Sequence, residues 1–204
     1  NYLSLIRVSS ESLLKIINDV LDLSKIQSSR FELEKNPFEL RKISDEVVGL
    51  MTFAASKKSL NFEILVHPNL FNDWKGDASR LRQILINLVG NAIKFTEAGS
   101  VIVRITKSEE RFEGDCRLCF KVTDTGIGIP KNRLTEIFKP FTQIQRETMQ
   151  YQAGTGLGLS ISKQLSDLMQ GDIEVSSEIG VGTTFSITIP LEPQIGRVTQ
   201  TGPE

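Results

Sequence analysis

The stretch NLVGNAIKFT, residues 87–96, carries two asparagines four positions apart within an apolar run that has helical spacing. Asparagine is a poor helix former because its side chain competes with the backbone for hydrogen bonds. At about 100° per residue, Asn87, Asn91 and Lys94 share one arc of a helix, well away from the apolar arc. The apolar arc comprises Leu81, Leu85, Leu88 and Ala92. The polar arc is either a solvated face or the wall of a cleft, where amide oxygens bind Mg²⁺ and an ammonium contacts phosphate.

Helices and strands are expected to alternate around this stretch. The helix that contains it should begin after Asp77, a favourable N-cap, and end at Phe95. The hydrophobic pattern predicts further helices over 43–54 and 158–170, the second of them stopped by Gly171. Strands are predicted over 60–66, 100–107, 117–124, 172–177 and 183–190.

A separate helix is predicted over residues 2–26. Its apolar residues recur at alternating steps of three and four, as in a coiled coil or a helical bundle. They are Leu3, Ile6, Leu13, Ile17 and Val20, with Ser10 filling the gap between Ile6 and Leu13 and with Leu14 and Leu21 beside the series. The pattern starts without a clear cap, so we expect the chain to begin partway through a helical hairpin. Residues 27–40 should form a connection, and residues 192–204 a disordered tail.

The composition excludes several classes of protein. The 204 residues are 39% hydrophobic and 24% charged, with a net charge of −1, which is unlike the basic surface of a nucleic-acid-binding protein. No apolar run approaches the roughly 20 residues needed to span a bilayer, and no secretory signal opens the chain. We therefore expect no nucleic-acid partner and no membrane contact by this fragment. The expected location is the cytoplasm, either as a free protein or as the cytoplasmic part of a membrane-anchored sensor.

The two cysteines, Cys116 and Cys119, form a C-x-x-C motif, which in some proteins binds metal or carries out redox chemistry. Here the motif overlaps a predicted strand, in which residues three apart point to opposite faces. No second cysteine pair or histidine cluster completes a metal site. We interpret both as structural thiols.

Two glycine-rich turns are the other candidate sites. DTGIGIP, residues 124–130, follows a strand, and Asp124 there is either part of a tight turn or an acceptor for an adenine amino group. GTGLGLSI, residues 154–161, opens a helix whose N-terminus offers free amides to phosphate. It lacks the G-K-[ST] ending of a P-loop and the preceding strand of a Rossmann turn. The polar segment 142–153 before it is long enough to form a lid.

Four motifs in this order resemble the N box, first G box, F box and second G box of sensor histidine kinases. They are NLVGNAIKFT, DTGIGIP, FKPF and GTGLGL. LLKIINDVLDLSKI, residues 13–26, resembles the second helix of the dimerisation and phosphotransfer hairpin of these kinases, especially of the hybrid type with attached receiver domains. The resemblance extends to about Pro190.

This resemblance implies an α+β fold of the GHKL (Bergerat) ATP-binding type. Such a fold is a two-layer α/β sandwich with a mixed sheet packed on helices, preceded here by one long helix. The implied organisation is a second hairpin helix over 1–29, with the first helix absent, a catalytic ATP-binding domain over 30–191 and a disordered tail over 192–204.

The resemblance also implies ATP and Mg²⁺ as cofactors and assigns a role to each motif residue. Asn87, Asn91 and Lys94 would form the catalytic set, in which the asparagines hold Mg²⁺ and the lysine contacts phosphate. The implied nucleotide-binding residues are Asn91, Lys94, Phe95, Asp124, Gly126, Gly128, Phe138, Gly154, Gly156, Leu157, Gly158 and Thr183. Asp124 would bind the adenine amino group, and Phe138 and Phe141 would pack at the base of the lid. Ala153 departs from the glycine common in related sequences, and Arg146 is a candidate for the lid's phosphate contact.

Asn87 distinguishes among the activities of this superfamily. Members that hydrolyse ATP, and its serine kinases, carry glutamate at the corresponding position, where it can deprotonate water or a hydroxyl. A neutral imidazole already has an available lone pair, so a histidine kinase does not need that base. The sequence therefore predicts a protein-histidine kinase core that transfers the γ-phosphate of ATP to histidine. The alternatives are a GHKL ATPase or serine kinase, and a degenerate nucleotide-binding module.

The phosphorylated histidine of such kinases lies in a motif that this sequence lacks. The single histidine, His67, precedes a proline at the end of a predicted strand, so we interpret it as a loop residue. The expected partners are the phosphotransfer hairpin of the same kinase, a response regulator or receiver domain for relay to its aspartate, and a second copy in a homodimer of the full-length protein.

Overall fold

The computed structural model describes residues 2–27, 32–108, 116–143 and 155–194. Five strands form the main sheet, in the order β2-β4-β5-β7-β6. Their bounds are Asn61–Val66 (β2), Ser100–Lys107 (β4), Arg117–Asp124 (β5), Gly182–Pro190 (β7) and Asp172–Glu178 (β6). β2 runs parallel to β4 and the remaining neighbours are antiparallel, so the sheet is mixed.

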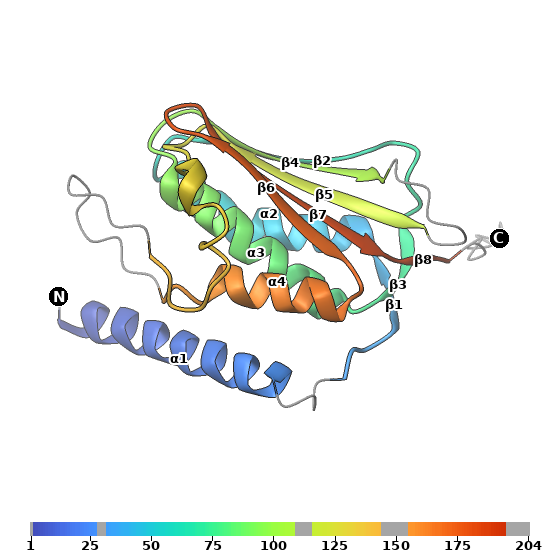
Figure 1. Cartoon of the computed structure of the whole chain (residues 1–204), viewed down its shortest axis with the longest axis horizontal. Coiled ribbons are helices and arrows are strands. Elements are labelled where there is room, and N and C mark those ends of the chain that lie inside the picture. The colour runs from blue at the N-terminus through green and yellow to red at the C-terminus, as the bar shows by residue number, and fades with distance from the viewer. Residues whose placement is uncertain (1, 28–31, 109–115, 144–154, 195–204) are drawn as a thin grey trace, which may run out of the picture.

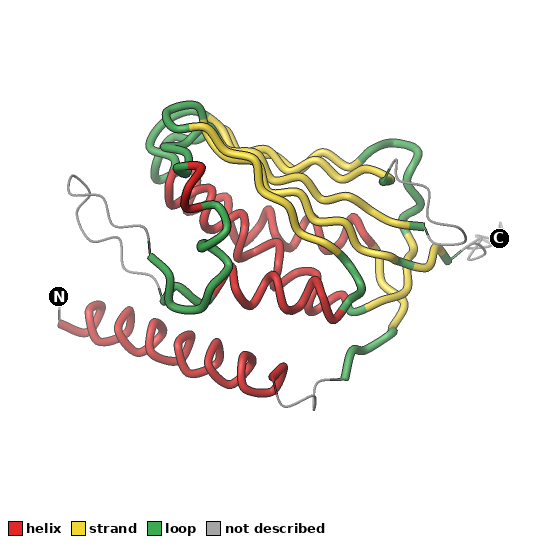
Figure 2. Tube along the Cα trace, in the orientation of Figure 1, coloured by secondary structure: helices red, strands yellow, loops and turns green. Residues whose placement is uncertain are grey.

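Helices cover one face of this sheet (Figures 1 and 2). They are α2 (Leu40–Ser56), α3 (Ala78–Phe95) and α4 (Gly158–Leu168). A longer helix, α1 (Tyr2–Gln27), lies beyond α4 from the sheet, and a 3₁₀ turn, η1, spans Lys131–Arg133. The predicted two-layer α+β sandwich with a preceding helix is confirmed.

The core lies between the sheet and its helices. Along β4 and β5 every second side chain is buried, as a sheet with one covered face requires: Val101, Val103, Ile105, Leu118, Phe120 and Val122. From α3 the predicted apolar arc meets them: Leu81, Leu85, Leu88 and Ala92 are all buried. Burial of this arc fixes the rotation of α3 and so turns its polar arc toward α4.

A second, small sheet was missed by the sequence analysis. It has the order β1-β3-β8, formed by Asn36–Glu39, Asp73–Gly76 and Glu192–Pro193. Strands of two to four residues are too short to show a period of two, and a proline within a strand cannot donate a ladder hydrogen bond. Pro37 and Pro193 lie in the edge strands, where a missing N–H is tolerated. The prediction of a disordered tail is therefore wrong for Glu192 and Pro193, and residues 195–204 lie outside the described part.

The cysteines are thiols in the structure, as the sequence predicted. Cys116 packs at the edge of the core just before β5, Cys119 lies within β5, and no disulfide joins them. Over the described ranges, no group of three or more histidine, cysteine or acidic residues is placed to hold a metal ion. Among the described helices, none combines the length and apolar character needed to cross a membrane.

α1 turns much of its apolar surface away from the rest of the chain. Ile6, Leu13, Ile17 and Val20 are exposed, whereas Leu23 is buried against the core. The side chain of Leu3, predicted to share this seam, lies outside the described part. Polar contacts hold the inner face of the helix: the Asp22 carboxylate accepts hydrogen bonds from Gln83 at 2.9 Å and Arg80 at 3.4 Å.

Candidate nucleotide-binding site

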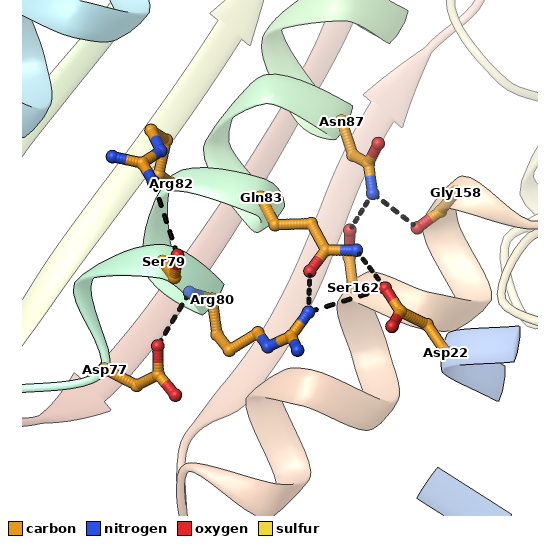
Figure 3. Close-up of polar contacts among 9 residues, drawn as sticks. All are labelled: Asp22, Asp77, Ser79, Arg80, Arg82, Gln83, Asn87, Gly158 and Ser162. Carbon is orange, nitrogen blue, oxygen red and sulfur yellow. Dashed lines mark hydrogen bonds and ion pairs between the residues drawn. The ribbon is translucent and has the colours of Figure 1, made fainter. Parts of the chain in front are cut away.

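α3 begins at the N-cap that the sequence predicted. The Asp77 carboxylate accepts a hydrogen bond from the Arg80 N–H at 3.0 Å, which satisfies one of the unpaired amides of the first helical turn (Figure 3). Its second oxygen accepts from the Glu34 N–H at 3.1 Å. The cap thus fixes both the start of α3 and the segment that leads to β1.

The polar arc of α3 faces the first turn of α4. The Asn87 amide group donates to the Gly158 carbonyl at 3.4 Å and to the Ser162 hydroxyl at 3.5 Å (Figure 3). These contacts direct the Asn87 amide oxygen away from Gly158 and Ser162 (Figure 3). Asn91 is half-buried on the same side of the helix. Two motifs 71 positions apart in sequence therefore meet at one place.

The C-terminal end of α3 adds a cation and an aromatic ring to this arc. The Lys94 ammonium lies 5.0 Å from the centre of the Phe95 ring, and 37% of Phe95 is exposed. Such an arrangement leaves an aromatic surface beside the polar arc, as the resemblance implied for the nucleotide pocket.

Asp124 closes the other side of the site at the end of β5. Its side chain is 7% exposed, and Oδ1 accepts hydrogen bonds from the Gly126 N–H at 2.8 Å and the Thr183 N–H at 3.3 Å. Burial raises the pKa of the Asp124 carboxyl above its usual value, although these two hydrogen bonds oppose the rise. Because both described bonds end on Oδ1, Oδ2 is the atom that can accept from a ligand.

Ser177 is a residue of this region that the sequence analysis missed. Its hydroxyl accepts from the Ile129 N–H at 2.8 Å and lies 2.9 Å from the Thr183 hydroxyl. It thereby ties the turn after Asp124 to the strand pair β6–β7, in which Ser177 lies opposite Thr183. Only the register of the β6–β7 pair brings Ser177 and Thr183 together, so no local sequence pattern could have revealed the role of Ser177.

The glycines of the turn after β5 are needed by the fold itself. A Cβ on Gly126 would come within 2.5 Å of the Phe95 carbonyl oxygen. Gly128 has a φ of +67°, and a Cβ there would come within 2.0 Å of the Glu178 carbonyl oxygen. The tight-turn and the functional interpretations of DTGIGIP are therefore compatible, because the close packing places Asp124 beside α3.

Gly128→Ala should destabilise the protein more than Gly180→Ala. Both glycines have positive φ, which costs alanine about 1–2 kcal/mol, but a Cβ on Gly180 has no atom within 4 Å. At Gly128 the collision with Glu178 should add a further 1–3 kcal/mol, roughly the cost of overpacking. Urea unfolding of both variants measures the difference, and equal losses would contradict the packing described here.

The second glycine-rich turn packs on the FKPF segment. Gly156 has a φ of +70°, and its carbonyl accepts from the Phe141 N–H at 3.0 Å. The Phe138 ring packs edge-on against Phe185, with ring centres 6.4 Å apart. Leu157 is fully buried, so its side chain belongs to the core and only its backbone can line the site. Gly154, Arg146 and Ala153 lie outside the described residues.

This turn also contacts α1. The Thr155 hydroxyl accepts from the Leu157 N–H at 3.1 Å and donates to the Asp19 carboxylate at 3.4 Å. Asp19 is buried although it lies on the long helix. The loop expected to surround phosphate is therefore in direct polar contact with the helix expected to belong to the hairpin.

His67 lies at the other end of the sheet. Its N–H donates to the Ile105 carbonyl, whereas Asp124 pairs with Val101 at the start of the same strand, β4. Four residues of strand separate these positions, or about 13 Å. The exposed His67 ring accepts from the Asn69 N–H at 3.3 Å through Nδ1. The prediction of a loop histidine is confirmed.

Comparisons with known proteins agree with this geometry. Residues 76–193 match the family described as histidine kinase-, DNA gyrase B- and HSP90-like ATPases. The chain is 41% identical over 189 residues to hybrid signal transduction histidine kinase B of Dictyostelium discoideum, a match that covers 93% of this chain and 10% of that protein. It is 39% identical over 196 residues to the circadian input-output histidine kinase CikA of Synechococcus elongatus, covering 95% and 25%.

A similar structure has also been solved. The crystal structure of full-length ShkA in complex with AMPPNP superposes with a TM-score of 0.80 and 34% sequence identity, covering 95% of this chain and 39% of that one. The chain spans 10% and 25% of the lengths of the two curated relatives.

Proposed function

The chain belongs to the family of histidine kinase-, DNA gyrase B- and HSP90-like ATPases, as the ATP-binding catalytic core of a sensor histidine kinase, and from this premise we propose its reaction. It binds ATP together with Mg²⁺ and transfers the γ-phosphate to a histidine on a phosphotransfer helix. The phosphate then passes to an aspartate of a response regulator or receiver domain. We place this activity in the cytoplasm, where ATP is available.

The observation that carries the proposal is the position of Asn87. It lies on the polar arc of α3, against the first turn of α4, where a hydrolytic enzyme would place a base next to the phosphates. An amide cannot take a proton from water or from a hydroxyl. This favours an acceptor that needs no deprotonation before attack, and it supports histidine over the alternative ATPase and serine kinase activities.

Asn87 and Asn91 fit a magnesium ion by the chemistry of their donor atoms. Amide oxygens are hard ligands of the kind that Mg²⁺ accepts, together with water and phosphate oxygens. The Asn87 amide nitrogen is already engaged by Gly158 and Ser162, which leaves its oxygen for a ligand. When bound, the ion would neutralise phosphate charge. ATP titrations with Mg²⁺ and with a chelator measure this contribution.

The remaining residues orient the nucleotide. Asp124 Oδ2 would accept from the adenine amino group, since a buried carboxylate with one oxygen engaged presents the other in a fixed direction. The N-terminus of α4 offers unpaired amides and the positive end of its dipole to phosphate. Lys94 would supply a charge on the same side, and Phe95 an apolar surface for the base.

The exposed seam of α1 supports a homodimer in the proposed full-length kinase. Leu13 is 58% exposed and Ile17 45%, and contiguous apolar surface of this kind marks an interaction site. We expect the chain to self-associate through this seam. Sedimentation velocity over a concentration series should show a dimer that Leu13→Gln with Ile17→Gln removes. A parent chain that is monomeric at every concentration would contradict this expectation.

The test of the proposed function is transfer in trans. The chain is incubated with radiolabelled ATP and a separate phosphotransfer hairpin that carries a histidine, and acid-labile label on the hairpin is measured. Label that depends on the histidine supports the proposal. Nucleotide binding without transfer would favour the degenerate module, and rapid release of inorganic phosphate would favour an ATPase.

A further inference from the structure

Lys58 lies outside all four motifs, yet its ammonium is among the most extensively bonded groups described near the site. It follows α2 in the turn that leads to β2 and is half-buried. Its Nζ donates to the carbonyls of Lys94 at 2.7 Å, Ile93 at 3.0 Å and Thr96 at 3.1 Å. A lysine ammonium has three N–H groups, so all three are used by the C-terminal end of α3.

These bonds complete the hydrogen bonding of a helix end that has no glycine cap. The last carbonyls of a helix have no partner within it, and a glycine in the left-handed conformation often solves the problem. Here the C-cap is Thr96, which has extended backbone, so that solution is absent. The carbonyls are satisfied instead by Thr96 Oγ1 for Ala92, by Lys58 for Ile93, Lys94 and Thr96, and by the Ile127 N–H for Phe95.

The same helix end forms one wall of the nucleotide site. The Phe95 carbonyl accepts from the Ile127 N–H at 3.3 Å, and it is the atom that a Cβ on Gly126 would meet at 2.5 Å. The turn that follows Asp124 therefore contacts the Phe95 carbonyl, which lies between the Lys94 and Thr96 carbonyls that Lys58 binds. A shift of this helix end would move Phe95 and the turn together.

We infer that Lys58 is a positioning residue for the nucleotide site, whose ammonium holds the C-terminal end of α3 where Phe95 and the turn after Asp124 face the base. The inference rests on the proposed nucleotide site. Lys58 acts through the backbone of α3 rather than through contact with the nucleotide, because its ammonium donates to three carbonyls there and lies 4.0 Å from the Glu97 carboxylate just beyond.

The neighbouring Lys57 provides a matched control. It is exposed, and its ammonium lies 4.5 Å from the centre of the Phe53 ring, which belongs to α2. Lys57→Met and Lys58→Met remove the same charge one position apart. We expect Lys58→Met to weaken ATP binding about tenfold, the affinity equivalent of one hydrogen bond to a charged group, and Lys57→Met to leave it unchanged.

Calorimetry at a temperature where urea unfolding shows both variants fully folded separates positioning from stability. A merely structural lysine would lower the free energy of unfolding and leave the affinity of the folded protein intact, and that result would overturn the inference. If the unaltered chain itself binds no ATP, the proposed function fails before the variants are compared. The two failures are therefore distinguishable.

Chemical rescue gives a second measurement that depends on the N–H groups. Lys58→Ala lacks the three methylenes and ammonium that n-propylammonium would replace. Adding n-propylammonium to this variant should recover ATP affinity, whereas tetramethylammonium at the same ionic strength, which has no N–H, should not. Recovery with both cations, or with neither in a folded variant that binds ATP more weakly, would show that donation to the α3 carbonyls is not what positions the site.

Discussion

Asp124→Asn is expected to weaken ATP binding by about 1–3 kcal/mol and, at the same time, to stabilise the ligand-free protein near neutral pH. The Gly126 and Thr183 N–H groups both donate to Oδ1, so an asparagine must keep its oxygen there. Its NH₂ group then replaces Oδ2 and meets the adenine amino group donor to donor. The base loses its acceptor and retains a buried, unpaired N–H.

The gain in stability follows from the pKa of the same carboxyl. Burial raises the folded-state pKa of Asp124 above the unfolded value of 3.8. As the pH rises through the window between the two pKa values, the unfolded chain releases its proton first, so the free energy of unfolding falls. Above this window the free energy of unfolding of the parent has fallen by its full amount and no longer changes through Asp124. Asparagine has no proton to release, so the variant should gain stability relative to the parent as the pH rises through this window.

Urea unfolding across a pH series, combined with calorimetric titration of ATP, measures both effects. Asp45→Asn, at an exposed position on α2, is the control for removal of one carboxylate. For the parent chain, ATP affinity should fall as acid protonates Asp124. If Asp124→Asn binds ATP as tightly as the parent, Asp124 does not bind the adenine amino group. If the difference in stability between variant and parent does not depend on pH, burial does not raise the pKa of Asp124.

The parts of the fold that the sequence predicted are those with long periodic patterns. α3 shows its apolar arc from Leu81 to Ala92 and its N-cap at Asp77, and β4 and β5 alternate over eight residues each. Tertiary packing agrees with these local signals, so they were sufficient. The small sheet around Trp74 has strands too short to alternate, and it exists because the segments before α2 and after β7 both pair with β3.

The candidate site likewise contains residues that the sequence could single out and contacts that it could not. Asn87 and Asp124 could be singled out because each lies in a motif with a recognisable neighbourhood in sequence. The bond from Asn87 to Gly158 spans 71 positions, that from Ile129 to Ser177 spans 48, and that from Lys58 to Ile93 spans 35. Such contacts depend on how the elements pack, and no local pattern in a single sequence encodes them.

The long helix α1 is joined to the rest of the chain by polar contacts at two places. Thr155 links the second glycine-rich turn to Asp19, and Gln83 on α3 donates to Asp22 three positions later on α1. The second glycine-rich turn and α3 are thus both bonded to α1. In the proposed kinase, the helix could not be displaced without breaking contacts of the loop that faces phosphate.

The chain alone is expected neither to phosphorylate itself nor to hydrolyse ATP rapidly, although it binds the nucleotide. Transfer forms a bond between an imidazole nitrogen and the γ-phosphorus and breaks the bond from that phosphorus to the bridging oxygen, so ADP leaves. The nitrogen must come within roughly 3–3.5 Å of the phosphorus. His67 is the only histidine, and it lies about four strand residues from the Asp124 end of β4, a separation of about 13 Å. Hydrolysis instead requires a base for water, and Asn87 cannot serve as one.

A separate hairpin that carries a histidine should therefore convert a binding protein into one that transfers phosphate. The rate should be lower than in a single chain, because docking is no longer intramolecular and loses the benefit of effective concentration. Replacing the hairpin histidine with glutamine should abolish the label, whereas His67→Ala should leave it unchanged. Asn91→Ala, which removes a proposed Mg²⁺ ligand, should reduce the label at least about tenfold, since even residues that only orient a metal ligand cost that much when replaced. Acid-labile label on the chain without a hairpin, lost in His67→Ala, would show that His67 reaches the nucleotide. The placement of His67 outside the site would then be wrong, because the chain would contain its own acceptor.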